Sequence, residues 1–328
     1  MSQRLQGLHH ITVITSSAPK IFKFMTEVLG LHLIKKTVNQ DDIRTYHLYF
    51  TDDMGSAGTD ITFLDFHGLE TARKGNNAIN RIGLCLPNDQ AVDWWEQRLD
   101  EFDIRHDPQT TQFGDKVLNF YDFDGQKYQF VSDEHNHGLP GGTPYRFSPI
   151  PKEYAIVGLG SALIRTQFRE KILNLVLTNL MGYDEIMTAG NLHLYESYDK
   201  GGHGAQVIVE DDMDGAMEVQ GYGSVHHLAF TVEDEEALRF WIELIDKIGL
   251  PNSGFVDRFY FKSEYFQPAT GILFEIATNG PGFLQDETYE EAGVHLELPP
   301  FLEEQRADIE ANLVAFNTPN TIEDDSNE

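Results

Sequence analysis

The stretch LHHITVIT, residues 8–15, opens a pattern that runs through the whole chain. Apolar and polar residues alternate in it, as in a half-buried β-strand. The following residues, APKIFKFMTEVLGL, place Ile21, Phe24 and Val28 on one helical face, with Ser17 or Ser16 available as the N-cap. Three strand-like runs come next: HLIKKTV, TYHLYFT and DITFLDF. The sequence therefore predicts a βαβββ unit.

The same order returns in three further units, which begin near Arg81, Ile156 and Ser224 with RIGLCLP, IVGLGSALI and SVHHLAFTV. Each opening strand precedes an amphipathic helix, and the expected apolar faces include Phe102 in the second unit and Leu175 in the third. A repeated unit of this kind indicates an α+β fold made of four βαβββ modules.

A Pro- and Gly-rich segment divides the repeats into two halves. It reads GLPGGTPYRFSPIP, and we interpret residues 138–152 as a linker. The N-terminal half then covers residues 5–137 and the C-terminal half residues 153–284, with two modules each. Residues 285–328 form a C-terminal extension, in which PPFLEEQRADIEANLVAF predicts a helix and the acidic tail TIEDDSNE predicts disorder.

Composition excludes several classes of function. The 328 residues include 24 Lys and Arg against 53 Asp and Glu, a formal charge of −29, which disfavours nucleic acid and anionic membranes as partners. The single cysteine, Cys85, excludes an intrachain disulfide and a thiolate zinc cluster. The N-terminus lacks the apolar stretch of a signal peptide, and no apolar run approaches bilayer-spanning length. We therefore expect a cytoplasmic protein.

Two histidine doublets stand at matching points of the first and fourth units, HHITVIT and HHLAFTV. Strand alternation puts His10 and Thr12 on one face of the first strand, and His227 and Ala229 on the corresponding face of the other. Glu275 is an acidic residue in the otherwise apolar strand GILFEIAT. Two imidazoles and one carboxylate form the facial set typical of non-haem Fe(II) and Mn(II), although Zn(II) and Ni(II) also accept these ligands.

The simpler interpretation is structural. A histidine at a strand start is more often a packing or surface residue, and Glu275 could pair with Arg258 and do nothing else. Four further candidates are expected to be structural or solvated: His135, His137, Asp65 and Gln129. The ligands lie 217 and 48 residues apart in the sequence, so units one and four must meet around one metal, which leaves units two and three to form a companion barrel without a metal.

With these residues in view, the chain resembles the vicinal oxygen chelate (glyoxalase/bleomycin-resistance/dioxygenase) superfamily. Within it, the sequence is most similar to the dioxygenases that open hydroquinone and chlorohydroquinone rings. The runs YHLYFTDDMGSAGT from Tyr46 and DRFYFKSEY from Asp257 also match, and the likeness extends from about Leu5 to about Pro300. The resemblance implies two curved mixed-sheet barrels, the glyoxalase-like fold.

The resemblance also implies roles for individual residues. It implies that the metal ligands are His10, His227 and Glu275. It further implies that the catalytic residues around the metal are His9, Thr12, His226, Arg258 and Tyr265. Arg258 would stabilise negative charge, and His226 and Tyr265 would move protons. Alternation alone puts His9 and His226 on the face opposite the metal, so their role rests on the resemblance.

The function implied is ring cleavage of a small hydroquinone-like or catechol-like compound, with Fe(II) or Mn(II) as cofactor and dioxygen as co-substrate. One alternative is a glyoxalase-type isomerase or thiol transferase, which uses Zn(II), Ni(II) or Mn(II) and consumes no oxygen. A second alternative is a non-enzymatic protein that binds an aromatic drug without a metal. The sequence permits homo-oligomers.

Overall fold

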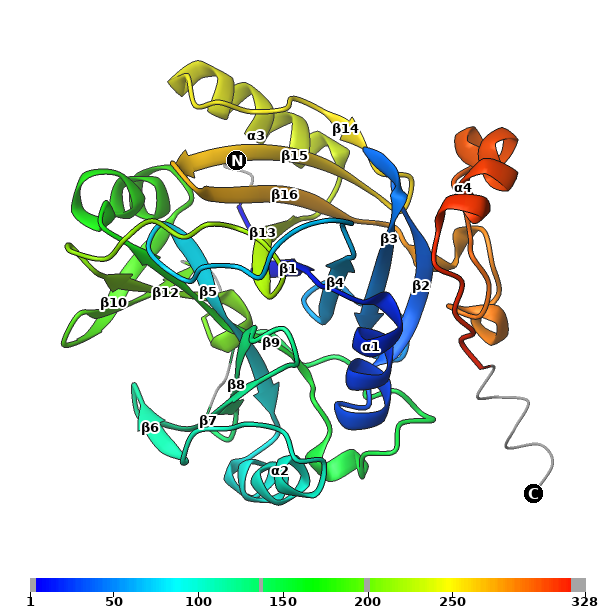
Figure 1. The fold of residues 1–328 in the computed structure, drawn as a ribbon. Coiled ribbons are helices and arrows are strands. Elements are labelled where there is room, and N and C mark those ends of the chain that lie inside the picture. Colours follow the sequence, from blue (N-terminus) through cyan, green and yellow to red (C-terminus); the bar gives the residue numbers. More distant parts are fainter. Residues whose placement is uncertain (1–3, 136–137, 198–200, 320–328) are drawn as a thin grey trace.

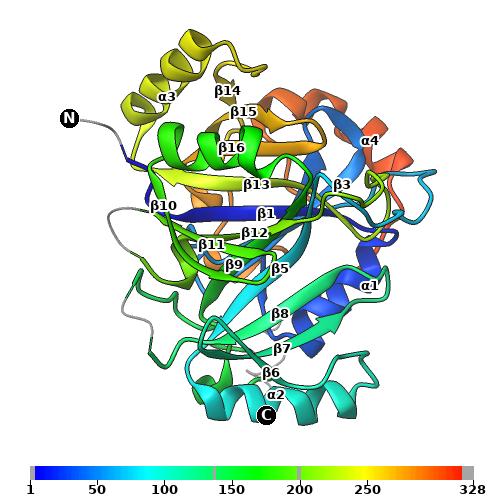
Figure 2. The same ribbon diagram turned by 90° about the vertical axis from the view of Figure 1, so that its left-hand side faces the viewer.

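Two eight-stranded mixed sheets form the framework of the protein in the computed structural model, which describes residues 4–135, 138–197 and 201–319. The first sheet has the order β14-β15-β16-β13-β1-β4-β3-β2, and the second has the order β10-β11-β12-β9-β5-β8-β7-β6. Both sheets curve, and helices lie on their outer faces (Figures 1 and 2). The predicted α+β fold is confirmed.

The strands of the first sheet are β1 (Leu8–Ile14), β2 (His32–Asn39), β3 (Asp42–Thr51), β4 (Asp60–Leu64), β13 (Ser224–Val232), β14 (Val256–Asp257), β15 (Phe261–Ala269) and β16 (Ile272–Pro281). Those of the second are β5 (Ala78–Leu86), β6 (Thr110–Gln112), β7 (Asp115–Tyr121), β8 (Lys127–Ser132), β9 (Gly158–Thr166), β10 (Tyr183–Ala189), β11 (Leu192–Ser197) and β12 (Gln206–Asp211). Each sheet thus joins one unit from each half of the chain. The first and fourth units meet, as predicted, and the structure shows that they do so within one sheet.

The opening strands of the units form the centre of each sheet. β1 pairs antiparallel with β13, with Thr12 opposite His227, and each of these strands also pairs in parallel with the last strand of its own unit. A parallel connection needs a crossover, and the helix of each unit supplies it. The doublets HHITVIT and HHLAFTV therefore lie on neighbouring strands.

The helices α2 (Asp89–Glu101) and α3 (Glu235–Ile248) follow ordinary capping rules. The side chains of Asn88 and Asp234 accept hydrogen bonds from backbone N–H groups three residues further on, and Trp95 and Trp241 are buried against the sheets. Phe102 lies just beyond the end of α2 and is 42% exposed, so its expected place on the apolar face is wrong.

The helices of the first and third units are less regular. Ser17 caps α1 (Ala18–Lys23), which widens into a π-helical segment at Phe24–Val28. The third unit has two such segments, Arg169–Leu173 and Val176–Leu180. Leu175 lies between them and is 49% exposed, so its expected place on the apolar face is also wrong. A π-helical turn is closed by i→i+5 hydrogen bonds and contains more residues than an α-helical turn. The spacing of 3.6 residues, from which the apolar face is predicted, therefore does not apply there.

The C-terminal extension, which contains α4 (Arg306–Asn312), packs along β2 (Figure 1). The backbone N–H of Glu297 donates to the carbonyl oxygen of Lys36 at 2.9 Å, and the fully buried Lys35 pairs with Asp286 at 2.7 Å. The predicted helix is present as a 3₁₀ turn, Pro300–Gln305, followed by α4. His137 and the tail TIEDDSNE lie outside the described residues.

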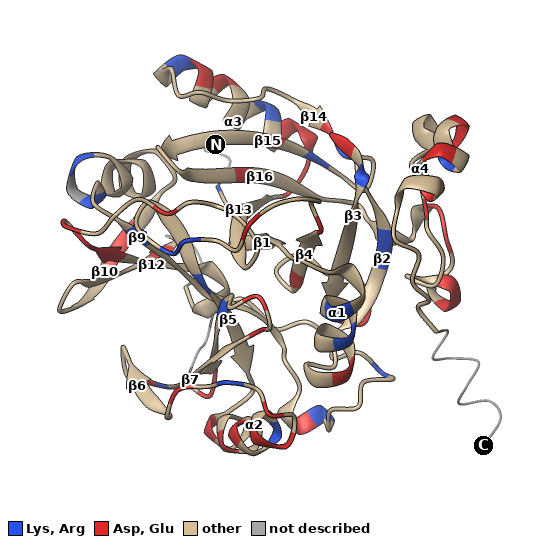
Figure 3. Ribbon diagram, in the orientation of Figure 1, with Lys and Arg blue, Asp and Glu red and all other residues tan. Residues whose placement is uncertain are grey.

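Acidic residues are spread over many elements of both sheets and their helices (Figure 3). No helix in the described ranges is sufficiently long and apolar for a membrane span.

Candidate metal centre

Three neighbouring strands, β16, β13 and β1, bring the predicted ligands together. The Nε2 atoms of His10 and His227 lie 3.1 Å apart. Oε2 of Glu275 lies 3.0 Å from His10 Nε2 and 2.9 Å from His227 Nε2. All three side chains are buried, so two imidazole nitrogens and one carboxylate oxygen form a nearly equilateral triangle inside the curved sheet.

The size of this triangle fits a metal ion with octahedral geometry. At bond lengths of about 2.1 Å, adjacent ligands lie about 3.0 Å apart around an octahedral ion and about 3.4 Å apart around a tetrahedral one. Oε2 of Glu275 has no hydrogen bond of acceptable geometry within the described residues, although both Nε2 atoms are close to it. A cation at the centre of the triangle would satisfy all three electron-pair donors at once.

The first histidine of each doublet lies behind the second. His9 Nδ1 is 2.9 Å from His10 Nδ1, and His226 Nδ1 is 2.8 Å from His227 Nδ1. His9 Nε2 lies 3.1 Å from the carbonyl oxygen of Thr278, to which it can only donate. His9 Nδ1 is then an acceptor, so His10 carries its proton on Nδ1 and presents an unprotonated Nε2 to the centre of the triangle.

Electrostatics within the triad follow from burial and close approach. Burial raises the pKa of Glu275, but the charge of His10 and the close approach of both imidazoles outweigh it and hold that pKa well below its ordinary value. Burial lowers the pKa of His10, but Glu275 outweighs this effect and the net pKa is raised. The pKa of His227 is lowered, chiefly by burial. The carboxylate is therefore ionised and ready to bind a cation.

Around the triad, Ser263 Oγ donates to Oε1 of Glu275, which leaves Oε2 for the centre of the triangle. Tyr265 lies opposite Glu275 on the neighbouring strand, and its hydroxyl accepts a hydrogen bond from Arg258 Nε at 3.1 Å. Arg258 also pairs with Asp41 at 2.8 Å. The structural alternative in which Arg258 serves as the ion-pair partner of Glu275 is therefore wrong.

A chain of hydrogen bonds leads away from the triad on the same face of the sheet. Thr12 Oγ1 lies 2.9 Å from His227 Nε2 and 2.8 Å from Thr62 Oγ1. His47 Nε2 lies 2.9 Å from Thr62 Oγ1, and Tyr49 OH lies 2.9 Å from His47 Nδ1. Alternation in TYHLYFT places His47 and Tyr49 on one face, but only the order of strands shows that this face looks toward the triad.

The partly exposed rim of the site consists of His47, His226, Arg258 and Tyr265, whereas the three ligands are buried. His226 also lines a hollow of about 490 Å³, together with Phe66 and other residues of the strand ends. Burial, followed by the charge of His227, lowers the pKa of His226 to about 3, so this imidazole is neutral at neutral pH. An organic molecule that approached from this side would meet the rim before the ligands.

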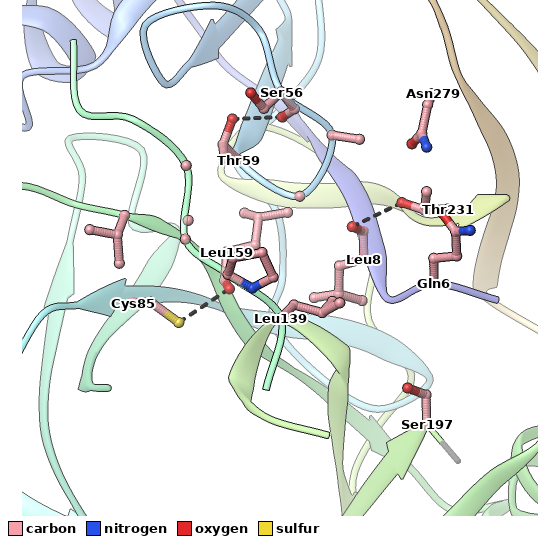
Figure 4. Close-up of a pocket in the computed structure, with 18 of the residues that line it drawn as sticks. Gln6, Leu8, Ser56, Thr59, Cys85, Leu139, Leu159, Ser197, Thr231 and Asn279 are labelled. Atoms are coloured by element: carbon pink, nitrogen blue, oxygen red, sulfur yellow. Dashed lines mark hydrogen bonds between the residues drawn. The ribbon is translucent and has the colours of Figure 1, made fainter. Parts of the chain in front are cut away.

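A further cavity lies away from the triad. It measures about 1190 Å³ and is lined by residues of both sheets, including Leu8, Cys85 and Leu159, but by none of the three ligands (Figure 4). The thiol of Cys85 is buried there and donates to the carbonyl oxygen of Leu159, and burial raises its pKa well above the ordinary value. Its chemistry is that of a packing residue.

Asp65 and Gln129, which we expect from the sequence to be structural, make hydrogen bonds within the fold. Asp65 accepts a hydrogen bond from the backbone N–H of Tyr46 at 2.7 Å, and Gln129 donates to Asn119 at 3.1 Å. His135 belongs to none of the metal-ligating groups formed by the described residues.

Asp60 was not identified from the sequence, although it is the β4 neighbour of His10. Its side chain is 1% exposed, and neither carboxylate oxygen has a hydrogen-bond partner among the described residues. Burial is the main cause that raises its pKa to about 8. In the metal-free protein this carboxyl group is therefore protonated at neutral pH.

The raised pKa makes a prediction for stability. Because an unfolded Asp releases its proton near pH 3.9, the unfolded chain binds fewer protons than the folded one between about pH 4 and pH 8, and the free energy of unfolding falls as pH rises through this window. Asp60→Asn removes this loss. In chelator-treated protein, we expect the variant's gain in urea midpoint over the parent to be larger at pH 8 than at pH 5; a gain independent of pH would contradict the assignment.

Comparison with known proteins supplies the family. The model of the glyoxalase/bleomycin resistance protein/dioxygenase superfamily matches residues 7–130. MhqA of Bacillus subtilis, provisionally named a ring-cleaving dioxygenase, is 39% identical over 315 residues, which cover 94% of this chain and 98% of MhqA. The chain belongs to this superfamily.

Other members of the superfamily agree over similar lengths. The chlorohydroquinone/hydroquinone 1,2-dioxygenase of Sphingobium indicum is 32% identical, with 92% of this chain and 94% of that enzyme covered. A crystal structure of a provisionally named dioxygenase from B. subtilis matches with a TM-score of 0.88 at 32% identity, over 97% and 99% of the two chains. Glyoxalase I from Zea mays shares the fold alone, with a TM-score of 0.59 at 12% identity, over 84% and 92%.

Proposed function

We propose that this protein is a metal-dependent ring-cleaving dioxygenase of hydroquinone-like or catechol-like compounds. The observation that carries the proposal is the buried triangle of His10, His227 and Glu275, with sides of 2.9–3.1 Å. Three protein ligands on one side of an octahedral ion leave positions for other molecules, which is the arrangement of non-haem oxygenases. We assign Fe(II) or Mn(II) to the site.

The names of the relatives support the substrate class. One relative that aligns along almost the whole chain acts on chlorohydroquinone and hydroquinone, and MhqA is provisionally named for ring cleavage. We extend this chemistry to the present chain as a small aromatic substrate with dioxygen as co-substrate, and we place the enzyme in the cytoplasm. When bound, the metal supplies Lewis acidity and a one-electron redox couple for the reaction of an electron-rich ring with dioxygen.

The roles of the rim follow from charge and protonation. Arg258 is the cation nearest to the phenol of Tyr265, and its guanidinium can stabilise negative charge that develops on the substrate. Burial and then Glu275 raise the pKa of Tyr265, so its phenol keeps its proton at neutral pH and can donate it. His226 is a neutral imidazole at the hollow; when its Nδ1 accepts from His227, its Nε2–H can donate a hydrogen bond to a substrate oxygen.

The decisive experiment measures oxygen uptake. Anaerobically purified protein is stripped with a chelator, reloaded with Fe(II), Mn(II) or Zn(II), and given a series of hydroquinones and catechols. We expect uptake of one dioxygen per ring opened with iron or manganese, and none with zinc, because ring cleavage needs a redox-active ion. Oxygen uptake with none of the metals, together with turnover of a methylglyoxal–thiol adduct, would instead establish an isomerase.

A further inference from the structure

The hydrogen-bond chain from Thr12 to Tyr49 is unused by the proposed chemistry, although it ends at the triad. Its members come from three adjacent strands: Thr12 from β1, Thr62 from β4, and His47 and Tyr49 from β3. Four consecutive contacts of 2.8–2.9 Å connect Tyr49 OH to His227 Nε2. The ring of Tyr49 also stacks on His47, with centroids 4.1 Å apart.

A cation in the triangle restricts the hydrogen bonds that Thr12, at the inner end of this series of contacts, can make. His227 Nε2 then gives its lone pair to the ion, so it neither donates a hydrogen bond to Thr12 nor accepts one from it. The Thr12 hydroxyl must donate either back to Thr62 or into the site. In the first case the hydrogen bonds run outward and end on the Tyr49 hydroxyl, and no other side chain or backbone group among the described residues accepts its proton.

In the second case every proton of the chain has an acceptor. Tyr49 donates to His47 Nδ1, His47 Nε2–H donates to Thr62, Thr62 donates to Thr12, and Thr12 donates into the site. An oxygen atom of a bound phenol would receive this last hydrogen bond, and a phenolate would receive it most strongly. A negatively charged ligand oxygen therefore favours this direction.

We propose that His47 and Tyr49 are positioning residues which, through Thr62, aim the Thr12 hydroxyl at the substrate oxygen in the metal site. The inference rests on the proposed function for the nature of the substrate. Desolvation, with further effects from His10 and His227, lowers the pKa of His47 well below its ordinary value, so its ring is neutral, with one donor and one acceptor nitrogen. Because a neutral imidazole has one donor and one acceptor nitrogen, the hydrogen bond on one side of the His47 ring determines the direction of the hydrogen bond on the other side.

The test breaks the chain at its middle. Thr62→Val keeps the shape of the side chain and removes the hydroxyl, Thr62→Ser restores the hydroxyl, and Tyr49→Phe removes the outermost donor while keeping the ring. Thr51→Val is the matched control, because Thr51 is a fully buried residue of β3 whose hydroxyl donates only to a backbone carbonyl, that of Asp52. All four variants are loaded with the metal that supports oxygen uptake in the parent protein.

We expect Thr62→Val and Tyr49→Phe to lower kcat/KM by about tenfold or more, as the loss of a residue behind the reacting groups commonly does. Thr62→Ser should recover most of the parent value. Thr51→Val should lower the melting temperature about as much as Thr62→Val and leave kcat/KM unchanged. Equal kinetics for Thr62→Val and the parent protein, or an equal loss in Thr51→Val, would overturn the proposal.

A second readout needs no turnover. In zinc-loaded protein with a bound phenol, long-range proton–nitrogen correlation of the imidazoles should show His47 protonated on Nε2 and unprotonated on Nδ1. A proton on Nδ1 would mean that the hydrogen bonds run from Thr12 toward Tyr49, which would overturn the proposal. If iron- and manganese-loaded parent protein consumes no oxygen, the proposed function fails, and the state of His47 still decides whether the chain points toward the site.

Discussion

Glu275→Gln is expected to remove the bound metal and, with it, oxygen uptake. The carboxylate supplies the only negative charge of the triad, and its Oε2 lies within 3.0 Å of both Nε2 atoms. The amide has the same size but is neutral and a much weaker ligand. Changes to residues behind metal ligands already cost roughly 10- to 100-fold in metal affinity, so the loss of a ligand should exceed about 100-fold. Metal content after dialysis and the initial rate of oxygen uptake check both parts.

The neighbouring strand offers a matched control. Glu264 is also fully buried, and neither of its carboxylate oxygens has a hydrogen-bond partner within the described residues, but it lies opposite Ile276 rather than within the triad. Burial, followed by Asp246, raises its pKa to about 8. Glu264→Gln should therefore leave metal content and activity unchanged and should not destabilise the fold. A Glu275→Gln variant that keeps a full equivalent of metal would contradict the assignment of this ligand.

The sequence alone could locate the triad because each ligand stands out from its local pattern. His10 and His227 occupy matching positions in two repeats, and Glu275 is charged where its strand is otherwise apolar. Strand alternation then selects one face, and the first and fourth units share a sheet as that selection requires. These signals are local, with a period of two residues, so they survive without knowledge of tertiary contacts.

The residues that the sequence did not reveal depend on pairings between strands. Asp60 becomes a neighbour of His10 only through the parallel register of β1 with β4, and Thr62 meets Thr12 through the same register. The edge strand β10 has no alternating apolar face in its sequence, because six of its seven residues are exposed. Leu175 was misplaced because a π-helical region does not follow the period of 3.6 residues.

Arg258→Met is expected to reduce kcat/KM while leaving the metal in place. The guanidinium is partly exposed at the rim, its Nε donates to Tyr265, and its carbon atom Cζ lies 5.0 Å from the centre of the Tyr265 ring. Removing one group that stabilises developing charge usually costs about 100- to 1000-fold in rate. Methionine preserves much of the side-chain volume, so the loss should appear in the rate of oxygen uptake, with metal content unchanged.

Asp41→Asn removes the ion-pair partner of Arg258 and keeps the charge of the guanidinium, so it tests the two contributions separately. Asp41 is 70% exposed and binds the other end of the guanidinium, at 2.8 Å. Such exposed pairs contribute roughly 0–1 kcal/mol, so Asp41→Asn should change kcat/KM by less than about fivefold and preserve the contact with Tyr265. Arg258→Lys keeps the charge but loses the Nε–H that reaches Tyr265, so an intermediate rate is expected. If Arg258→Met and Asp41→Asn have equally small effects, Arg258 serves only to anchor the rim, and another group must stabilise the charge that develops on the ring.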